Sequence, residues 1–286
     1  MHALLSMKIL YLHQYFKFPH ESGGTRSFDL SLGFINLGHD VEVITSTSDP
    51  SYKSSKRWVI IKKENINVHY IYMPYDNNMS YPTRIKVFIM FLWYSSLKLL
   101  SLKGDLVLAT STPLTIGIPA LIKKWFHKTP FIFEVRDVWP EAVIAVGAVK
   151  NKLIQKALYY LEFLIYKNAS AIVPLSKDMK KSITKRYPMI STKPIQVIEN
   201  ISEINRFQIG VNNKNFLIKN KIGFKPRFTI LYAGAFGRIN GLGYVIELAE
   251  KIVLKDPSIA FILIGAGAEK EHILHHAKEA NILNNN

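Results

Sequence analysis

Short apolar runs alternate with amphipathic stretches along most of the chain, which is the pattern of strands that are each followed by a helix. Phe28, Leu32 and Ile35 recur at helical spacing, and Gly38 favours a helix end there. Ser176 is placed to cap a short basic helix that ends before Pro188. Further helices are predicted at 84–102, 114–127 and 151–167. Seven strands are predicted, at 8–12, 41–44, 68–73, 105–109, 130–135, 171–174 and 195–198.

The rest of the chain repeats this rhythm after an interruption. Residues 199–226 are polar and rich in Asn, as expected of a linker, so we predict domains at 7–206 and 207–286. The predicted elements that follow are strands at 228–233 and 259–264 and helices at 241–255 and 268–280. The predicted fold class is α/β, with doubly wound, Rossmann-like parallel sheets. Because two strands are few for such a sheet, we expect the second domain to be incomplete.

The amino-acid composition excludes several classes of function. The 286 residues are 48% apolar, enough for a substantial core, and no cysteine is present. Disulfides, cysteine metal ligands and a cysteine nucleophile are therefore excluded. The longest charge-free apolar run, 87–97, is too short to span a membrane. Nine histidines show no metal-binding spacing, and we expect no metal.

A glycine-rich turn follows the first predicted strand. Gly23 and Gly24 precede Thr25 and Arg26, which open a helix. Glycines at such a turn let a phosphate approach backbone N–H groups at the helix N-terminus, and Arg26 adds a positive charge. A turn without a ligand is the alternative. The turn is not GxGxxG and no acidic residue ends the second strand, so NAD binding is disfavoured.

The segment from Phe133 to Glu141 places charges directly after a predicted buried strand. Arg136, Asp137 and Glu141 lie at or near the carboxyl end of that strand, where ligands of open α/β sheets bind. We therefore treat these three as candidate catalytic residues that orient a hydroxyl or a sugar. An ion network of Arg136 and Asp137 with a purely structural role is the alternative.

The predicted second domain contains two more glycine turns. Gly234, Gly237 and Arg238 lie between a strand and a helix, and small residues with one arginine suit a diphosphate. Gly265 and Gly267 follow the next strand, and close helix packing is the simpler explanation for them.

These stretches, in this order, resemble glycosyltransferase family 4, whose members are retaining enzymes of the GT-B fold. The branch they resemble most is the O-antigen and capsule transferases, including the fucosamine-transferase type. The resemblance covers residues 7–283. It is carried by the Gly23–Gly24 loop, Arg136-Asp137-Val-Trp-Pro-Glu141, Val197-Ile-Glu-Asn200, the Gly234–Gly241 loop and Gly265-Ala-Gly267.

The resemblance implies an enzyme of the hexosyltransferase type that moves a sugar from a nucleotide-sugar donor, UDP-linked in preference to GDP-linked. Gly23, Gly24, Arg26, Gly234, Gly237 and Arg238 would then bind the donor, and no separate cofactor is needed. The family's acidic pair at E-x7-E spacing is expected beyond residue 286. Glu271 and Glu279 have that spacing, but we expect them on the solvent face of one helix. The alternative function is a truncated, non-catalytic remnant or subunit that keeps only the acceptor domain.

The net charge of the chain indicates what kind of surface the protein contacts. Lys and Arg number 37 against 21 Asp and Glu, a formal net charge of +16. An anionic membrane surface, nucleic acid and a merely solvated charge excess are the three explanations. The sequence contains no nucleic-acid-binding motif. The apolar, aromatic segment at 85–97 is flanked by lysines, and this favours the explanation that the protein binds a membrane surface. The resemblance implies a saccharide or lipid-linked acceptor, so we expect a cytoplasmic protein on the inner face of the cell membrane.

Overall fold

A computed structural model describes residues 6–21, 23–74, 79, 81–111, 113–145, 147, 149–201, 204, 228–237 and 240–283. The chain divides into two compact units, Met1–Ser202 and Glu203–Asn286. The predicted domain boundary between residues 206 and 207 falls outside the described residues.

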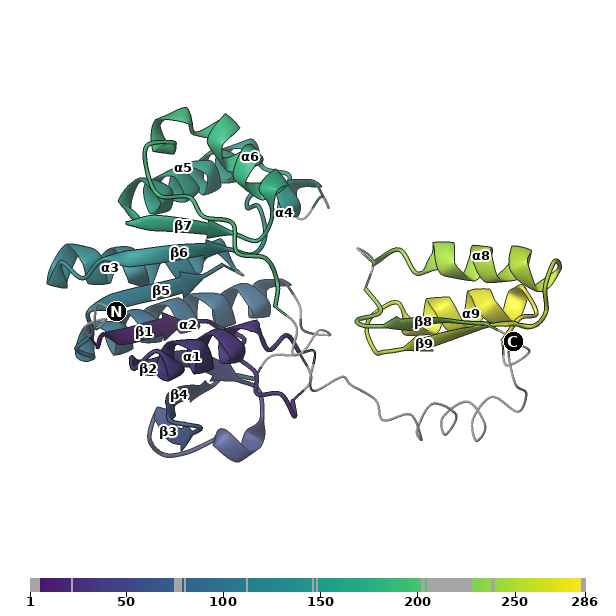
Figure 1. Ribbon diagram of the computed structural model, residues 1–286, viewed down its shortest axis with the longest axis horizontal. Helices are drawn as coiled ribbons and strands as arrows, with labels where there is room; N and C mark the ends of the chain where they lie inside the picture. Colours follow the sequence, from purple (N-terminus) through teal and green to yellow (C-terminus); the bar gives the residue numbers. More distant parts are fainter. Residues whose placement is uncertain are drawn as a thin grey trace. The chain divides into compact units, whose positions relative to one another are not determined.

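The first unit is built on a seven-stranded sheet with the order β3-β4-β2-β1-β5-β6-β7 (Figure 1). Every neighbouring pair is parallel except β3 and β4, which pair antiparallel. The carboxyl ends of the six parallel strands therefore meet at one edge of the sheet. The strands are β1 (Lys8–Leu12), β2 (Asp40–Thr47), β3 (Trp58–Lys63), β4 (Ile66–Tyr72), β5 (Leu106–Thr110), β6 (Phe131–Val135) and β7 (Ala171–Pro174).

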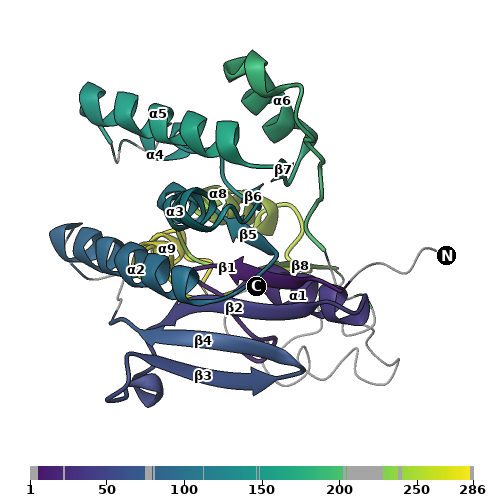
Figure 2. The same ribbon diagram turned by 90° about the vertical axis from the view of Figure 1, so that its left-hand side faces the viewer.

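Helices cover both faces of this sheet. Figure 2 shows α2, α3 and α5 on one face and α1 on the other. The helices are α1 (Arg26–Asn36), α2 (Tyr81–Ser101), α3 (Gly117–His127), α4 (Glu141–Ala145), α5 (Lys152–Asn168) and α6 (Lys177–Arg186). In the described part of this unit, the 3₁₀ turns η1 (Pro50–Tyr52), η2 (Leu114–Ile116) and η3 (Pro188–Ile190) join the elements.

Alternation along the strands produces two separate apolar cores. On β1, Leu10 and Leu12 face the core beneath α2, α3 and α5, whereas Ile9 and Tyr11 face the core beneath α1. Strands whose two faces both pack against a core have continuous runs of apolar residues, and this is why the sequence predicted them.

In its described residues, the second unit has two parallel strands and two helices. They are β8 (Phe228–Ala233), α8 (Gly243–Val253), β9 (Ile259–Ile264) and α9 (Lys270–Glu279). Phe236, Leu242, Ile246, Ile273 and Ala277 form its core. Glu271 and Glu279 are exposed on α9, as predicted.

The predicted α/β class and parallel sheets are confirmed, with two corrections to the strands, and the short helix α4 was not predicted. Strand β3 was missed: it forms a hairpin with β4 through Glu64 and Asn65, which both adopt positive φ. The predicted strand at 195–198 is wrong, since only Ile195 makes a bridge, to Ile172. The N–H groups of Gln196 and Ile198 donate to Ile172 and Pro174 of β7, but Pro174 lacks the N–H that would complete the ladder.

Candidate functional site

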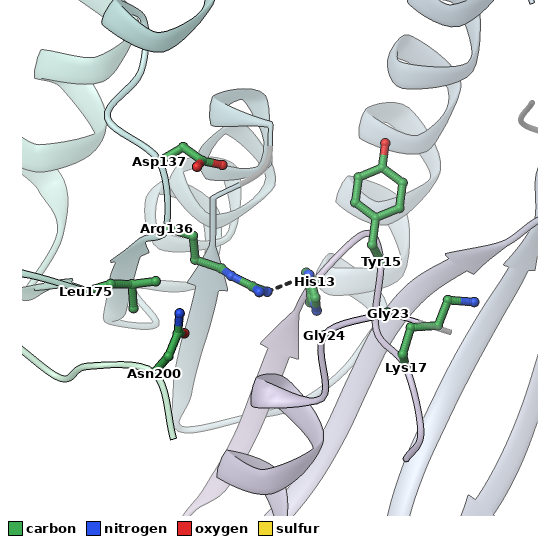
Figure 3. Close-up of a pocket in the computed structure, with 9 residues that line it drawn as sticks. All are labelled: His13, Tyr15, Lys17, Gly23, Gly24, Arg136, Asp137, Leu175 and Asn200. Carbon is green, nitrogen blue, oxygen red and sulfur yellow. Dashed lines mark hydrogen bonds between the residues drawn. The ribbon is translucent and has the colours of Figure 1, made fainter. Parts of the chain in front are cut away.

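A pocket of about 430 Å³ opens at the edge of the first sheet where the parallel strands end (Figure 3). Segments that follow β1, β6 and β7 converge on it. Figure 3 shows Arg136 and Asp137 on one side and Tyr15 and Lys17 on the other. The pocket is lined by His13, Tyr15, Lys17, Gly23, Gly24, Arg136, Asp137, Leu175 and Asn200.

His13 fixes the arginine of the pocket. It is the first residue after β1 and is 3% exposed. Its Nε2 lies 3.2 Å from Nη1 of Arg136, and its Nδ1 lies 2.9 Å from Oγ of Ser27. Burial, together with the nearby Arg136 charge, lowers the pKa of His13 to about 3. The imidazole is therefore neutral near pH 7, so Nε2 accepts from Arg136 and Nδ1–H donates to Ser27.

Arg136 is also held through its backbone, where its N–H donates to Oγ of Ser111 at 2.8 Å. A guanidinium has five N–H donors, and His13 takes one of them. This arrangement presents a positive charge at a fixed position in the pocket that Asp137 also lines. Such a pair of charges suits binding of an anionic group next to a hydroxyl.

Arg26 lies under the glycine turn in a buried ion pair. Its Nε and Nη2 each lie 2.9 Å from Oε1 of Glu134, and both side chains are at most 4% exposed. Arg26 also donates to the carbonyl oxygens of Ile198 and Glu199, while Thr110 donates to Oε2 of Glu134. The geometry thus favours a structural role in joining α1, β6 and the 198–199 segment. A donor-binding role for Arg26 stays a prediction.

The two glycines of the first turn line the pocket. Gly23 has a φ of +140°, which favours glycine, and an added Cβ would lie 3.0 Å from Cγ of Lys17. At Gly24 an added Cβ would lie 3.5 Å from Nη2 of Arg136, an ordinary contact. The backbone of the turn is therefore next to the guanidinium, as a shared anion site requires.

Glu141 does not line this pocket. It begins α4 and pairs with Arg186 of α6, which also donates to the buried Glu162. Ser182 of α6 donates to Glu141 as well. The structure therefore brings Arg136 and Asp137 together at the pocket but places the third candidate catalytic residue in a network with α6.

In the second unit, Gly237 lines a cavity of about 150 Å³ where α8 begins. Glu269 and His272 of the α9 region also line it. Gly234 does not line the cavity, and an added Cβ there would lie 2.8 Å from Oη of Tyr232. Arg238 lies outside the described residues, so its role in donor binding stays a prediction.

Sequence reasoning missed five residues of the pocket: His13, Tyr15, Lys17, Leu175 and Asn200. A usable signal existed for the first three, which alternate directly after a buried strand at its carboxyl end. Asn200 ends one of the quoted motifs, but nothing in its spacing placed it beside Arg136. Within the described residues, no group of three or more histidines and carboxylates could hold a metal ion.

Comparisons with known proteins agree with this fold. Over 96% of the chain, the structure resembles sucrose-phosphate synthase from Thermosynechococcus elongatus, with a TM-score of 0.68, 14% identity and 68% of that chain covered. It also resembles an alpha,alpha-trehalose-phosphate synthase (UDP-forming) from Burkholderia vietnamiensis. Here the TM-score is 0.68 and the identity 9%, over 97% of this chain and 70% of that one. These likenesses confirm the GT-B type of α/β fold.

The sequence is 23% identical over 196 residues to "Probable glycosyltransferase WbjE" from Pseudomonas aeruginosa. That match covers 68% of this chain and 48% of the relative, so the chain spans about half the length of the curated protein it matches. The model of glycosyltransferase family 4 matches residues 23–206, which include the pocket residues from Gly23 to Asn200. Because that match extends over more than half of its residues, the chain belongs to glycosyltransferase family 4.

Proposed function

We propose that the chain takes part in a retaining glycosyl transfer from a nucleotide-sugar donor, which is UDP-linked in preference to GDP-linked. The proposed pathway is the assembly of a bacterial surface polysaccharide of the O-antigen or capsule type. The acceptor is a saccharide, free or lipid-linked. The observation that carries this proposal is the pocket in which Arg136 and Asp137 face the Gly23–Gly24 turn. Membership of glycosyltransferase family 4 supports glycosyl transfer as the reaction. The geometry of the pocket supports the roles proposed for Arg136 and Asp137.

In the proposed reaction, the bond between the anomeric carbon and the donor's diphosphate oxygen breaks. An acceptor hydroxyl forms the new bond on the same face of the sugar and passes its proton to the departing diphosphate oxygen. Asp137 orients the reacting hydroxyl, and Arg136 positions the reacting groups because His13 holds its guanidinium. Arg238 is proposed to offset charge that develops on the leaving diphosphate. Fixed charges aimed at developing charge are the largest contribution in many enzymes.

Nucleotide binding is the direct test of this proposal. UDP is expected to raise the unfolding temperature of the chain, because a ligand that binds only the folded state stabilises it by about 2.7 kcal/mol at one hundred times its Kd. GDP is expected to give a smaller rise. Absence of any rise with either nucleotide, or with UDP-sugars, would favour the non-catalytic alternative.

Asp137→Asn tests the catalytic role. We expect a loss of transfer of roughly 10²–10³-fold with the fold unchanged, since the variant removes a charge aimed at the reacting groups. Asp178→Asn is the matched control, because Asp178 is an exposed acid on α6 of the same unit. Transfer from a panel of UDP-sugars to a lipid-linked acceptor is the measurement. Wild-type turnover by Asp137→Asn would overturn the role.

We also propose that the first unit lies on an anionic membrane surface. Ile85, Ile89, Trp93 and Leu97 follow one another at four-residue spacing on α2, and Trp93 is 61% exposed. On α3, which packs beside α2, Phe126 is 76% exposed. Within the described residues, no helix has the length and apolarity needed to cross a bilayer. A stripe of this kind suits the interface of a bilayer.

Part of the basic excess is not available to lipids. Lys123 is buried and donates to the carbonyl oxygen of Leu102, and Lys124 donates to that of Asn168. Exposed lysines remain on α2 and α5, including Lys86, Lys152 and Lys156. Each such charge near an anionic surface contributes about 1 kcal/mol.

Sedimentation with vesicles tests the membrane surface. Trp93→Ser is expected to weaken binding to phosphatidylglycerol vesicles several-fold. Leu37→Ser is the control, since Leu37 is 59% exposed but follows α1 on the opposite face of the sheet. Equal loss in both variants, or no binding of the wild type in low salt, would contradict the proposal.

A further inference from the structure

A second pocket of the first unit has no part in the site described above. It measures about 280 Å³ and is formed by the η1–β3 segment, the end of β4 and the middle of α2. It shares no lining residue with the first pocket. Its lining residues are Tyr52, Lys53, Ser54, Lys56, Arg57, Ile71, Tyr72, Met73, Met90 and Tyr94.

Three cations within five consecutive residues give this pocket its charge. Lys53, Lys56 and Arg57 are exposed, and no carboxylate is among the lining residues in the described part of the chain. The Arg57 guanidinium lies over the Tyr94 ring, with its carbon 4.1 Å from the ring centroid. That stacking holds the arginine side chain in one position. A guanidinium fixed in this way is suited to binding a phosphate.

The segment that carries these cations has a defined backbone. Asp49 caps η1 by accepting from the N–H of Ser51, and the N–H of Lys53 donates to the carbonyl oxygen of Pro50. η1 also packs against β4. The cationic cluster is therefore part of the fold, and it closes the β4 side of the pocket.

Both pockets lie at the same edge of the sheet. β4 ends at Tyr72 beside the second pocket, and β1 ends beside the first, with β2 between them. Figure 1 shows β3 and β4 at one side of the sheet and β6 and β7 at the other. Neighbouring strands are about 4.8 Å apart, so β4 lies roughly 10 Å from β1 and roughly 19 Å from β6, the strand that Arg136 follows. An oligosaccharide of a few sugar units can bridge such a gap.

The second pocket also continues into the apolar stripe of α2. Met90 lines the pocket, while its neighbours Ile89 and Trp93 belong to the exposed stripe. A cationic, aromatic pocket thus borders a surface suited to hydrocarbon. The ligand that matches this arrangement has a densely charged phosphate group between a lipid and a sugar.

We infer that this pocket binds the diphosphate group of a lipid-linked acceptor, whose lipid follows α2 and whose saccharide extends to the Arg136–Asp137 pocket. The inference rests on the proposed function for the identity of the acceptor. Lys53, Lys56 and Arg57 supply charge-assisted hydrogen bonds to the phosphate oxygens. No bond is made or broken at this site.

Isothermal titration of the whole chain with inorganic pyrophosphate in low salt tests the pocket. Lys53→Gln/Lys56→Gln removes two exposed lysines and leaves Arg57 on Tyr94, so circular dichroism is expected to show an unchanged fold. Lys152→Gln/Lys156→Gln removes the same charge from exposed positions of α5. We expect the wild type and this control to bind equally, and the first double variant at least about tenfold more weakly.

Arg136→Gln tests whether this binding event lies in the first pocket instead. We expect it to retain the binding event that Lys53→Gln/Lys56→Gln loses. If Arg136→Gln loses that event and the double variant keeps it, or if no binding is detected in the wild type, the inference is overturned.

Vesicles separate a diphosphate from a general anionic surface. Phosphatidylcholine vesicles with a polyprenyl diphosphate are compared with phosphatidylglycerol vesicles of equal charge, and the double variant is expected to lose its preference for the diphosphate lipid. Equal weakening on both vesicles would assign the pocket to the bilayer surface and overturn the inference. Neither readout needs sugar transfer, so a failure of transfer alone would remove the proposed function and leave this binding site standing.

Discussion

The glycine turn after β1 and the glycine turn after β9 look alike in sequence but have different surroundings. An added Cβ at Gly24 would make an ordinary 3.5 Å contact with Arg136 at the edge of a pocket. An added Cβ at Gly265 would lie 1.9 Å from the carbonyl oxygen of Gly234, and at Gly267 it would lie 2.4 Å from that of Phe236. The first turn therefore leaves space for a ligand, whereas the second is filled by the chain itself. A strand–glycine–helix signal alone does not separate these two cases.

The support beneath the two turns differs as well. Arg26, the first residue of α1, is joined to Glu134 of β6 by a buried ion pair. The turn after β9 rests on close backbone packing against Phe236. One turn is thus sensitive to loss of charge, and the other to added volume.

The largest expected effect comes from Glu134→Gln, which leaves the Arg26 guanidinium buried beside a neutral partner. Breaking a buried pair in this way costs about 3–5 kcal/mol, and we expect a loss of that size in the free energy of unfolding. Urea unfolding followed by circular dichroism is the measurement. The same substitution at Glu279, which pairs with His275 on the exposed side of α9, is expected to change little. Equal effects at both positions would show that burial is not the cause.

The second effect tests close packing in the other turn. Gly265→Ala is expected to destabilise the second unit by about 2–3 kcal/mol, because a methyl group cannot fit against the Gly234 backbone. Hydrogen exchange of the β8 and β9 amides reports on that unit alone. Gly243→Ala is the control, since an added Cβ there meets nothing within 4 Å. Protection factors that stay unchanged in Gly265→Ala would refute the packing argument.

The sequence predicted those parts of the fold that depend on neighbouring residues, and not those that depend on residues far apart in the chain. The buried parallel strands were predicted because each is a continuous apolar run, and Ser176 does cap α6 by accepting from Met179. Strand β3 was missed because it is a half-exposed edge strand without a clear period. Asn65, at positive φ in a two-residue turn, was the signal that would have identified its hairpin.

The site was predictable only where its residues follow one strand. Arg136 and Asp137 come directly after β6, and the rule about carboxyl ends places them correctly at the pocket. Glu141 is only four residues further, yet its partner Arg186 belongs to α6 and no local pattern connects them. Likewise, Glu134 lies 108 residues from Arg26 in the sequence, so the ion pair under the turn could not be foreseen.

A third effect concerns pH. The pKa of His13 is about 3 in the folded chain and 6.5 when exposed, so below pH 6.5 the unfolded chain takes up a proton that the folded chain does not. Stability is therefore expected to fall as the pH drops from 7 to 5, by about 2 kcal/mol from this residue. His69, whose pKa burial also lowers, adds to the same trend. Urea unfolding at pH 7 and pH 5 is the measurement, and His13→Asn is expected to reduce the dependence. An identical slope in His13→Asn would contradict a buried neutral imidazole beside Arg136.

The smallest expected effect on stability is that of Gly24→Ala, and it separates the two turns most sharply. Gly24 does not have a positive φ, and its added methyl would make only an ordinary contact with Arg136, so unfolding is expected to change by less than about 0.5 kcal/mol. The methyl nevertheless projects toward the guanidinium that we propose as part of the reaction site. Activity should therefore fall while the fold persists, the reverse of Gly265→Ala, in which the fold of the second unit fails first. Gly33→Ala on α1, where nothing lies within 4 Å, is the matched control: it should leave activity unchanged and raise stability by about 0.5–1 kcal/mol, because alanine replaces a glycine inside a helix. Full transfer activity in Gly24→Ala would show that the space beside Arg136 is not used by substrate.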